Sequence, residues 1–116
     1  MAAIFVYTDP MRNLDLSDYP VEVYRDGKFV EEPYRFTRSL IGILFMQEGL
    51  SADLILERDD IARKIKSGVA TGTILLEENE YKQILGAVNA FRSYGQNDVE
   101  LVRRVRNAPQ VDVKVA

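Results

Sequence analysis

The chain has 116 residues, 47% of them hydrophobic and 28% charged, so we expect one globular domain over residues 1–116. It contains no cysteine and no histidine, which excludes disulfides, thiolate nucleophiles, sulfur-ligated zinc and histidine-based proton transfer. We therefore expect no enzyme, no metal and no cofactor. The net charge of −3 has the wrong sign for a general DNA coat, and no apolar run predicts a membrane span, so we expect a cytoplasmic protein.

The N-terminal third predicts β-structure. Residues 3–8 are β-branched and aromatic and stop at Asp9-Pro10, which indicates a short strand followed by a loop of about a dozen residues. Alternating residues then flank Asp26-Gly27, a pair that tolerates positive φ, and this pattern predicts a hairpin over 21–36. We expect Pro33 and the two acids before it to interrupt its second strand.

The first predicted helix spans residues 38–48, with Thr37 as N-cap and Gly49 as the stop. Its apolar residues lie around the whole circumference, a pattern typical of a buried helix. In so small a domain, this predicts a central helix between sheet and other helices, an oligomer interface over part of its surface, or both.

Three further helices and a last strand complete the prediction. The helices are expected over 52–66 after an N-cap at Ser51, over 77–94 before Gly95, and over 99–107 after an N-cap at Asp98. Residues 73–76 favour a brief extended segment, and strict alternation over 110–115 predicts the strand. Gly86 and Ala90 suggest close approach of another backbone. The predicted fold is α+β: a small antiparallel sheet of N-terminal strand, hairpin and C-terminal strand, packed on about four helices.

The aromatic residues of the hairpin are interleaved with acids, among them Glu22, Glu31 and Glu32. This pattern disfavours nucleic acid and fits a basic protein partner, or else a sheet that packs on the first helix. Our leading hypothesis is a non-catalytic protein-interaction module that forms homo-oligomers. The candidate partner-binding residues are Tyr24, Phe29 and Tyr34 on the hairpin and Phe45 and Met46 on the first helix.

Four arginines support an alternative from another class, a nucleic-acid-associated regulator: Arg92, Arg103, Arg104 and Arg106. The last two predicted helices are joined by a short turn, as in a helix-turn-helix. However, Asp98 and Glu100 lie where a recognition helix meets the DNA, and the arginines cluster at the end where cations complement the helix dipole.

Two further patterns are weaker indications of a site. The segment 68–73 is glycine-rich but lacks the lysine and spacing of a Walker A loop, so we expect a linker. Glu77, Glu78 and Glu80 crowd one helix start, where the helix dipole alone explains acids. Carboxylate-dependent hydrolysis would require two such groups in one apolar cleft with one raised pKa.

The layout resembles small accessory proteins encoded by bacteriophages and prophages, over about residues 21–105. The likeness lies in Asp26-Gly27-Lys28-Phe29-Val30, in the stretch from Glu57-Arg58 to Lys64-Ile65, and in Leu76-Glu77-Glu78. The resemblance implies an accessory or host-interaction role in the host cytoplasm. It brings no site residues with it.

Overall fold

The computed structural model describes residues 7–47 and 49–115, and it has the predicted α+β fold. The helices are α1 (Phe36–Phe45), α2 (Ala52–Ser67), α3 (Glu78–Ala90) and α4 (Val99–Arg106), and a short 3-10 turn, η1 (Gln96–Asp98), precedes α4. The strands are β1 (Tyr7–Asp15), β2 (Tyr19–Arg25), β3 (Lys28–Tyr34), β4 (Thr73–Glu77) and β5 (Gln110–Val115).

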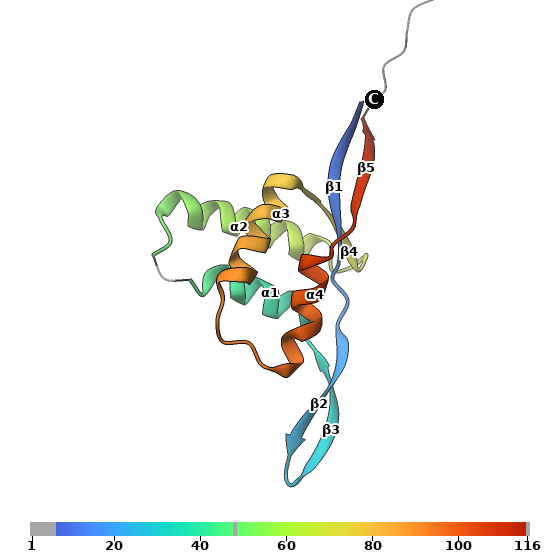
Figure 1. Ribbon diagram of the computed structural model, residues 1–116, viewed down its shortest axis with the longest axis vertical. Coiled ribbons are helices and arrows are strands. Elements are labelled where there is room, and N and C mark those ends of the chain that lie inside the picture. The colour runs from blue at the N-terminus through green and yellow to red at the C-terminus, as the bar shows by residue number, and fades with distance from the viewer. Residues whose placement is uncertain (1–6, 48, 116) are drawn as a thin grey trace, which may run out of the picture.

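The strands form two separate antiparallel sheets, and the expected single sheet is wrong in this respect. One sheet has the order β4-β1-β5, and β2 with β3 forms the other. Residues 16–18 carry the chain from one sheet to the other, along α4 and the start of α1. The hairpin therefore projects from one end of the helical body and the β1–β5 ribbon from the opposite end (Figure 1).

Strand β1 is longer than predicted and passes through Pro10. Residues 3–6 of the predicted strand lie outside the described residues. Pro10 pairs with Asp112 of β5, whereas β4 pairs with β1 only from Met11 onward. Pro10 thus sits where β1 has a neighbour on one side only, a position that tolerates a missing N–H. The predicted loop shrinks to residues 16–18.

The hairpin prediction is confirmed. Asp26 and Gly27 adopt φ values of 50° and 81°, as a tight two-residue turn requires. Strand β3 runs without interruption through Pro33, which lies opposite Pro20. A two-stranded sheet has an open edge on each strand, so Pro33 does not break the ladder, and the expected interruption is wrong.

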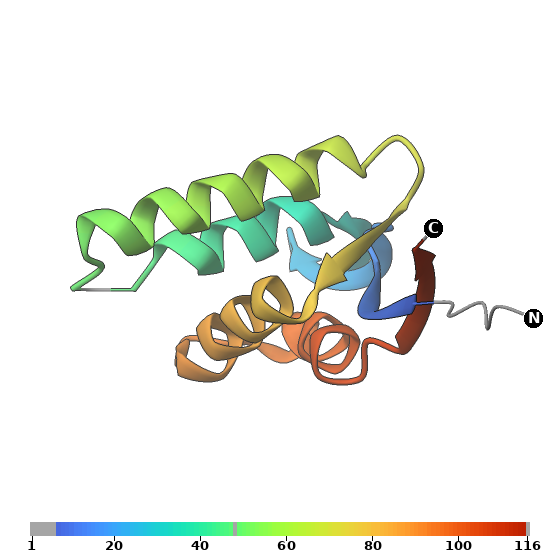
Figure 2. The ribbon, with the colours of Figure 1, turned by 90° about the horizontal axis from the view of Figure 1, so that it is seen from above.

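The helices enclose one hydrophobic core, which also receives residues from β1 and β4. Figure 2 shows α1 and α2 as one antiparallel pair and α3 with α4 as a second. Phe36, Leu40 and Leu44 of α1 have no exposed surface, and α1 packs against α2 and α3. The burial of α1 is incomplete, as one of the two expected arrangements allows: Phe45 at its C-terminal end and the following Met46 are exposed.

Several helix ends differ from the prediction because distant residues cap them. Helix α1 begins at Phe36, before the expected Thr37 cap, since the Asp18 carboxylate accepts a hydrogen bond from the Phe36 amide. It also ends before Gly49, where the buried Arg58 of α2 donates to the Leu44 carbonyl at 2.9 Å. Ser51 caps α2 as predicted.

The last two helices also depart from the sequence pattern, here through contacts between residues close together in the chain. Helix α3 ends at Ala90 instead of near residue 94, and the Tyr94 hydroxyl donates to the Val88 carbonyl at 2.6 Å. The Asp98 carboxylate does not cap α4 but accepts from the Gly95 amide. Gly86 is exposed and no atom would approach a Cβ there, so the expected close backbone approach is wrong.

Candidate interaction surface

The hairpin presents two faces, and the strand register assigns each side chain to one of them. Opposed pairs alternate along the ladder: Tyr24 with Phe29, Glu22 with Glu31, and Pro20 with Pro33 share one side. We call the surface formed by Tyr24, Phe29, Glu22 and Glu31 the aromatic–acidic face. Since the hairpin leaves the helical body, this face is carried beyond the core (Figure 1).

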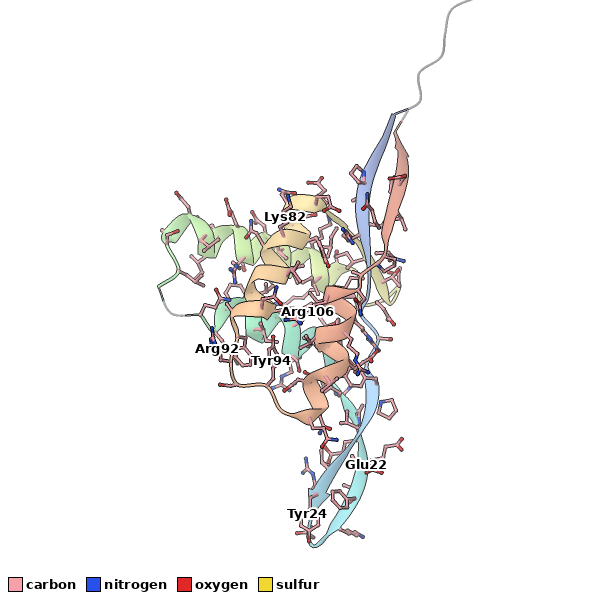
Figure 3. The ribbon with its side chains drawn as sticks, in the orientation of Figure 1. Glu22, Tyr24, Lys82, Arg92, Tyr94 and Arg106 are labelled. Carbon is pink, nitrogen blue, oxygen red and sulfur yellow. The ribbon has the colours of Figure 1, made fainter. Side chains whose placement is uncertain are left out.

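The aromatic pair at the hairpin tip has no core to pack against. The rings of Tyr24 and Phe29 meet edge to face, with centroids 5.2 Å apart. Their exposed fractions are 65% and 69%, and Tyr24 lies beside the turn in Figure 3. The interpretation in which these two side chains pack on the first helix is therefore wrong. Each ring covers part of the other, and the remainder faces solvent.

The acidic pair beside the tip is electrostatically unfavourable in the isolated chain. Glu22 and Glu31 stand directly opposite each other and both are exposed. Like charges in opposed positions destabilise a sheet. Among the described residues neither carboxylate has an ion-pair partner, whereas Glu32 binds Arg25 at 2.7 Å on the other side of the hairpin. The aromatic–acidic face thus carries uncompensated negative charge.

The base of the hairpin, in contrast, is fastened to the body. Tyr19 and Tyr34 stack with ring centroids 4.6 Å apart. The Tyr19 hydroxyl donates to the Asn97 carbonyl at 2.7 Å, and the Tyr34 hydroxyl donates to the Asp98 carboxylate. Burial and the bond to Asp98 raise the pKa of Tyr34. Tyr34, a predicted partner-binding residue, is therefore a half-buried anchor and lies away from the tip.

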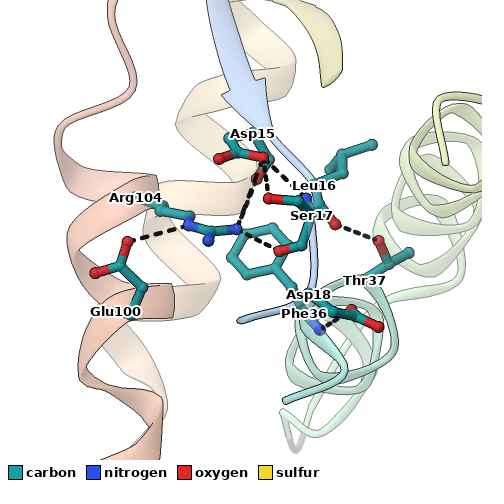
Figure 4. A network of polar contacts seen from close by, with 8 residues as sticks. All are labelled: Asp15, Leu16, Ser17, Asp18, Phe36, Thr37, Glu100 and Arg104. Atoms are coloured by element: carbon teal, nitrogen blue, oxygen red, sulfur yellow. Dashed lines mark hydrogen bonds and ion pairs between the residues drawn. The ribbon is translucent and has the colours of Figure 1, made fainter. Parts of the chain in front are cut away.

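Arg104 is the centre of the polar network that holds the hairpin base (Figure 4). Its guanidinium donates to the Ser17 carbonyl at 2.5 Å and to Glu100 at 3.2 Å. It also stacks over Tyr19 and Phe36, 5.0 and 4.9 Å from the ring centroids. With only 14% of its side chain exposed, Arg104 is committed to the fold and is not available for phosphate.

Asp15 is also part of this network, with its carboxylate 3.8 Å from the Arg104 guanidinium. Burial acts to raise its pKa, but hydrogen bonds from the Ser17 hydroxyl and amide, together with the charge of Arg104, outweigh burial and lower it. Asp15 is therefore held as a carboxylate beside the guanidinium. The connection between β1 and β2 is thus a rigid joint. The sequence patterns singled out Arg104 and Glu100 for another reason and did not indicate this network.

The other three arginines of the alternative hypothesis remain at the surface. Arg92, Arg103 and Arg106 are exposed, and none of them forms an ion pair with a described residue. Arg92 follows α3 and Arg106 lies on α4 (Figure 3). Arg106 donates to the side chain of Asn89 on α3 at 3.1 Å. All three lie on or next to the α3–α4 pair, and Arg103 lines a depression that also contains Glu22 and Phe29 of the hairpin.

Phe45 and Met46 lie in a different part of the molecule. They are 37% and 64% exposed at the C-terminal end of α1, which faces away from the hairpin (Figure 1). The five predicted partner-binding residues therefore do not form one surface. The structure separates them into the tip pair, the anchoring Tyr34 and this helix end.

A groove beside the hairpin base was missed by sequence reasoning. It encloses about 670 Å³, and we call it the basic groove. Its lining consists of Leu16, Ser17, Asp18, Arg35, Thr37, Arg38, Ile41, Lys66 and Val69. Three cationic side chains from two separate segments converge here. Because the segments are far apart in sequence, a pattern within one helix or strand could not have shown the groove.

The acidic residues near the start of α3 and the glycine-rich segment 68–73 have structural roles. Glu78 pairs with Arg12 and Glu80 with Lys64, at 3.0 and 2.6 Å. No three carboxylates gather into a metal-binding group within the described part of the chain. In the segment 68–73, Gly68 is buried: a Cβ there would come within 3.0 Å of Leu16 and of the Thr73 carbonyl. This segment is a tight turn between α2 and β4.

Comparisons with known proteins identify no related protein. No protein-family model matches the chain, and neither a curated protein nor a solved structure matches it. None of the helices described here is long and apolar enough to cross a bilayer.

Proposed function

We propose that the protein is a non-catalytic interaction module whose hairpin is the binding arm. One observation carries the proposal: the aromatic–acidic face projects from a rigid base, and its side chains have no hydrogen-bond or ion-pair partner among the described residues. The resemblance to phage accessory proteins supports the same role, in a host cytoplasm. The absence of histidine and cysteine fits a protein that works by binding.

The chemistry of the face favours a cationic partner. Exposed tyrosine and phenylalanine rings provide large contact area at low entropic cost and are frequent anchors of protein interfaces. Arginine and lysine side chains bind favourably to aromatic faces. A cation placed between Tyr24 and the two glutamates would also relieve the repulsion between Glu22 and Glu31. A basic protein surface satisfies both requirements at once.

The test compares two exposed apolar pairs of the same chain. Protein carrying Tyr24→Ala and Phe29→Ala, immobilised beside wild type, is expected to lose a partner that wild type retains from extracts of the native host. The matched control carries Phe45→Ala and Met46→Ala, which removes exposed apolar surface elsewhere. The retained protein is then purified and its affinity measured by titration calorimetry against all three chains.

The expected result is at least a tenfold loss of affinity for the hairpin variant, or about 1.4 kcal/mol, with the control close to wild type. Equal binding by the hairpin variant and wild type would overturn the proposal. Loss only in the Phe45/Met46 variant would assign the function to the end of α1.

Nucleic-acid binding is a second candidate, supported by the exposed Arg92, Arg103 and Arg106. These side chains would contact phosphate and not bases, so affinity should fall steeply with salt. A gel shift at low salt with duplex and single-stranded probes tests it, and the variant Arg103→Ala/Arg106→Ala is expected to reduce any retardation. No retardation by wild type would remove this candidate.

A further inference from the structure

We infer that the hairpin of one copy binds the basic groove of a second copy, and that the contact is reciprocal. The inference rests on the proposed function of the hairpin and identifies its partner as this same chain. It brings together two surfaces that are separate within one molecule: the aromatic–acidic face and the basic groove.

The charges of the two surfaces are complementary. The groove carries Arg35, Arg38 and Lys66 against one carboxylate, Asp18, so its net charge is 3 − 1 = +2. Asp18 is already bound to Arg35 at 3.1 Å. Arg38 and Lys66 are exposed and lack an ion pair with any residue that the structure describes. Two cations at the rim are therefore available to an acidic partner.

The hairpin supplies the opposite charge. Residues 19–34 contain four acidic and two basic side chains, which gives a net charge of 2 − 4 = −2. The acids are Glu22, Asp26, Glu31 and Glu32, and the bases are Arg25 and Lys28. Only the pair Glu22–Glu31 shares a face with the exposed rings. These two carboxylates are the natural counterparts of Arg38 and Lys66.

The apolar parts also match. Leu16, Ile41 and Val69 contribute apolar lining to the groove, and Val69 is 53% exposed. Tyr24 and Phe29 are 65% and 69% exposed. Seating these rings on the groove would remove apolar surface from water on both sides, which is favourable. Charged rims around an apolar centre are the usual anatomy of a specific interface.

The position of the groove explains why a hairpin must bind the groove of another copy and why the resulting dimer is a closed one. Asp18 lies just before β2 and Arg35 just after β3, so the groove is at the base of the hairpin. A seven-residue strand spans about 23 Å, which keeps the tip away from its own base. Two hairpins placed side by side in opposite directions put each tip at the other base. This arrangement has two-fold symmetry and forms a closed dimer.

A charge-swap experiment tests the inference. Variant G carries Arg38→Glu and Lys66→Glu in the groove, and variant H carries Glu22→Lys and Glu31→Lys on the hairpin. Molar mass is measured by light scattering after gel filtration, with chains loaded at about 100 µM, where a dimer of micromolar Kd is nearly saturated. Wild type is expected to be a dimer, and G and H alone are expected to be monomers.

An equimolar mixture of G and H is expected to restore the dimer. In the mixed pair the acidic hairpin of G meets the basic groove of H, and the basic hairpin of H meets the acidic groove of G. Both contacts are then attractive, as in wild type. The control Lys82→Glu/Arg92→Glu makes the same change of charge on exposed residues of α3 and its C-terminal end and should remain a dimer. Circular dichroism and melting curves confirm that each variant is folded.

Each outcome decides the inference. A monomeric wild type overturns it, and so does a dimer that persists in G or H, or a mixture of folded G and H that stays monomeric. A monomeric wild type whose hairpin still binds a host protein leaves the proposed function intact, so the two failures are distinguishable. Restoration in the mixture is not expected from any other partner or from a small anion.

Discussion

The hairpin contains two cross-strand aromatic pairs with opposite surroundings. At the base, Tyr19 and Tyr34 are half-buried, stacked, and bonded through both hydroxyls to residues before α4. At the tip, Tyr24 and Phe29 are about two-thirds exposed and contact each other. The same two strands thus connect a base that contacts the helical body to a tip that does not contact the core.

This difference separates stability from binding. Burial and hydrogen bonds at the base contribute to folding, because removing them leaves polar groups without partners. Exposed rings at the tip contribute little to folding, and a two-stranded hairpin is marginal by itself. The rigid base therefore fixes the orientation of the aromatic–acidic face, and we propose that this face contacts another molecule. Substitutions at the two ends should have different consequences.

The largest effect is expected at the base, from Arg104→Ala. The change removes the bond to the Ser17 carbonyl and the stacking on Tyr19 and Phe36. We expect a loss of about 3 kcal/mol in the free energy of unfolding, from a charge-assisted hydrogen bond and cation–π contacts. Urea denaturation followed by circular dichroism measures it.

The neighbouring Arg103→Ala is the matched control. Arg103 is exposed and forms no ion pair with the residues described, so its removal should change stability by less than about 0.5 kcal/mol. Equal losses for the two variants would contradict the structural role of Arg104. A larger loss for Arg103 would contradict it more strongly.

An intermediate effect is expected from Tyr34→Phe, which removes the bond to Asp98 and keeps the ring stack. The loss should be about 1–2 kcal/mol at neutral pH. The pKa of Tyr34 is raised above its ordinary 10.0, so the folded chain keeps the phenolic proton where the unfolded chain releases it. This stabilisation is complete below about pH 10 and is lost as the pH rises further.

Unfolding curves at neutral pH and above pH 10 measure this prediction. The stability difference between wild type and Tyr34→Phe should shrink at the higher pH, because the unfolded wild-type chain becomes ionised there. Tyr24→Phe is the control, since the Tyr24 hydroxyl is at the exposed tip. A difference that stays constant or grows with pH would contradict the proposed bond.

A small effect on stability is expected at the tip. Tyr24→Ala combined with Phe29→Ala removes an exposed edge-to-face pair worth less than about 1 kcal/mol. Thermal melting should therefore change little, while dimer formation in light scattering is abolished. Unfolding of this variant under native conditions would show that the tip pair belongs to the fold after all.

The smallest effect is a gain, expected from Glu31→Gln. The substitution removes the repulsion with Glu22 directly opposite, and it should stabilise the isolated chain by roughly a few tenths of a kcal/mol. Glu32→Gln is the control, since it breaks the ion pair with Arg25 and should not stabilise. Urea unfolding at low salt measures both. A loss for Glu31→Gln would indicate that its charge is compensated.

Local chemistry made part of the fold predictable. The turn at Asp26-Gly27, the cap at Ser51 and the alternating last strand each depend on neighbouring residues, and the structure confirms all three. The α+β class follows from the same patterns. Such signals act within a few residues, so a single sequence displays them.

Most of the wrong predictions concern features that residues distant in the sequence determine. The Phe36 amide donates to the Asp18 carboxylate, so α1 begins earlier than predicted, and Arg58 of α2 donates to the Leu44 carbonyl near the end of α1. The division into two sheets depends on how residues 16–18 cross α4. At the candidate site, Tyr24 and Phe29 were predicted, but the basic groove and the role of Arg104 come from side chains that only the fold brings together.

The most direct test of the account is a photo-crosslinking comparison between the two ends of the hairpin. Benzoylphenylalanine is placed at Phe29 in one chain and at Tyr34 in another, and the adducts are mapped by mass spectrometry. The account predicts adducts between molecules from position 29 and adducts within one molecule, to residues 97–98, from position 34. Adducts from position 29 to Tyr24 within one molecule are expected from the contact between the two rings. The absence of adducts between molecules from position 29, or equal yields between molecules from both positions, would contradict the account.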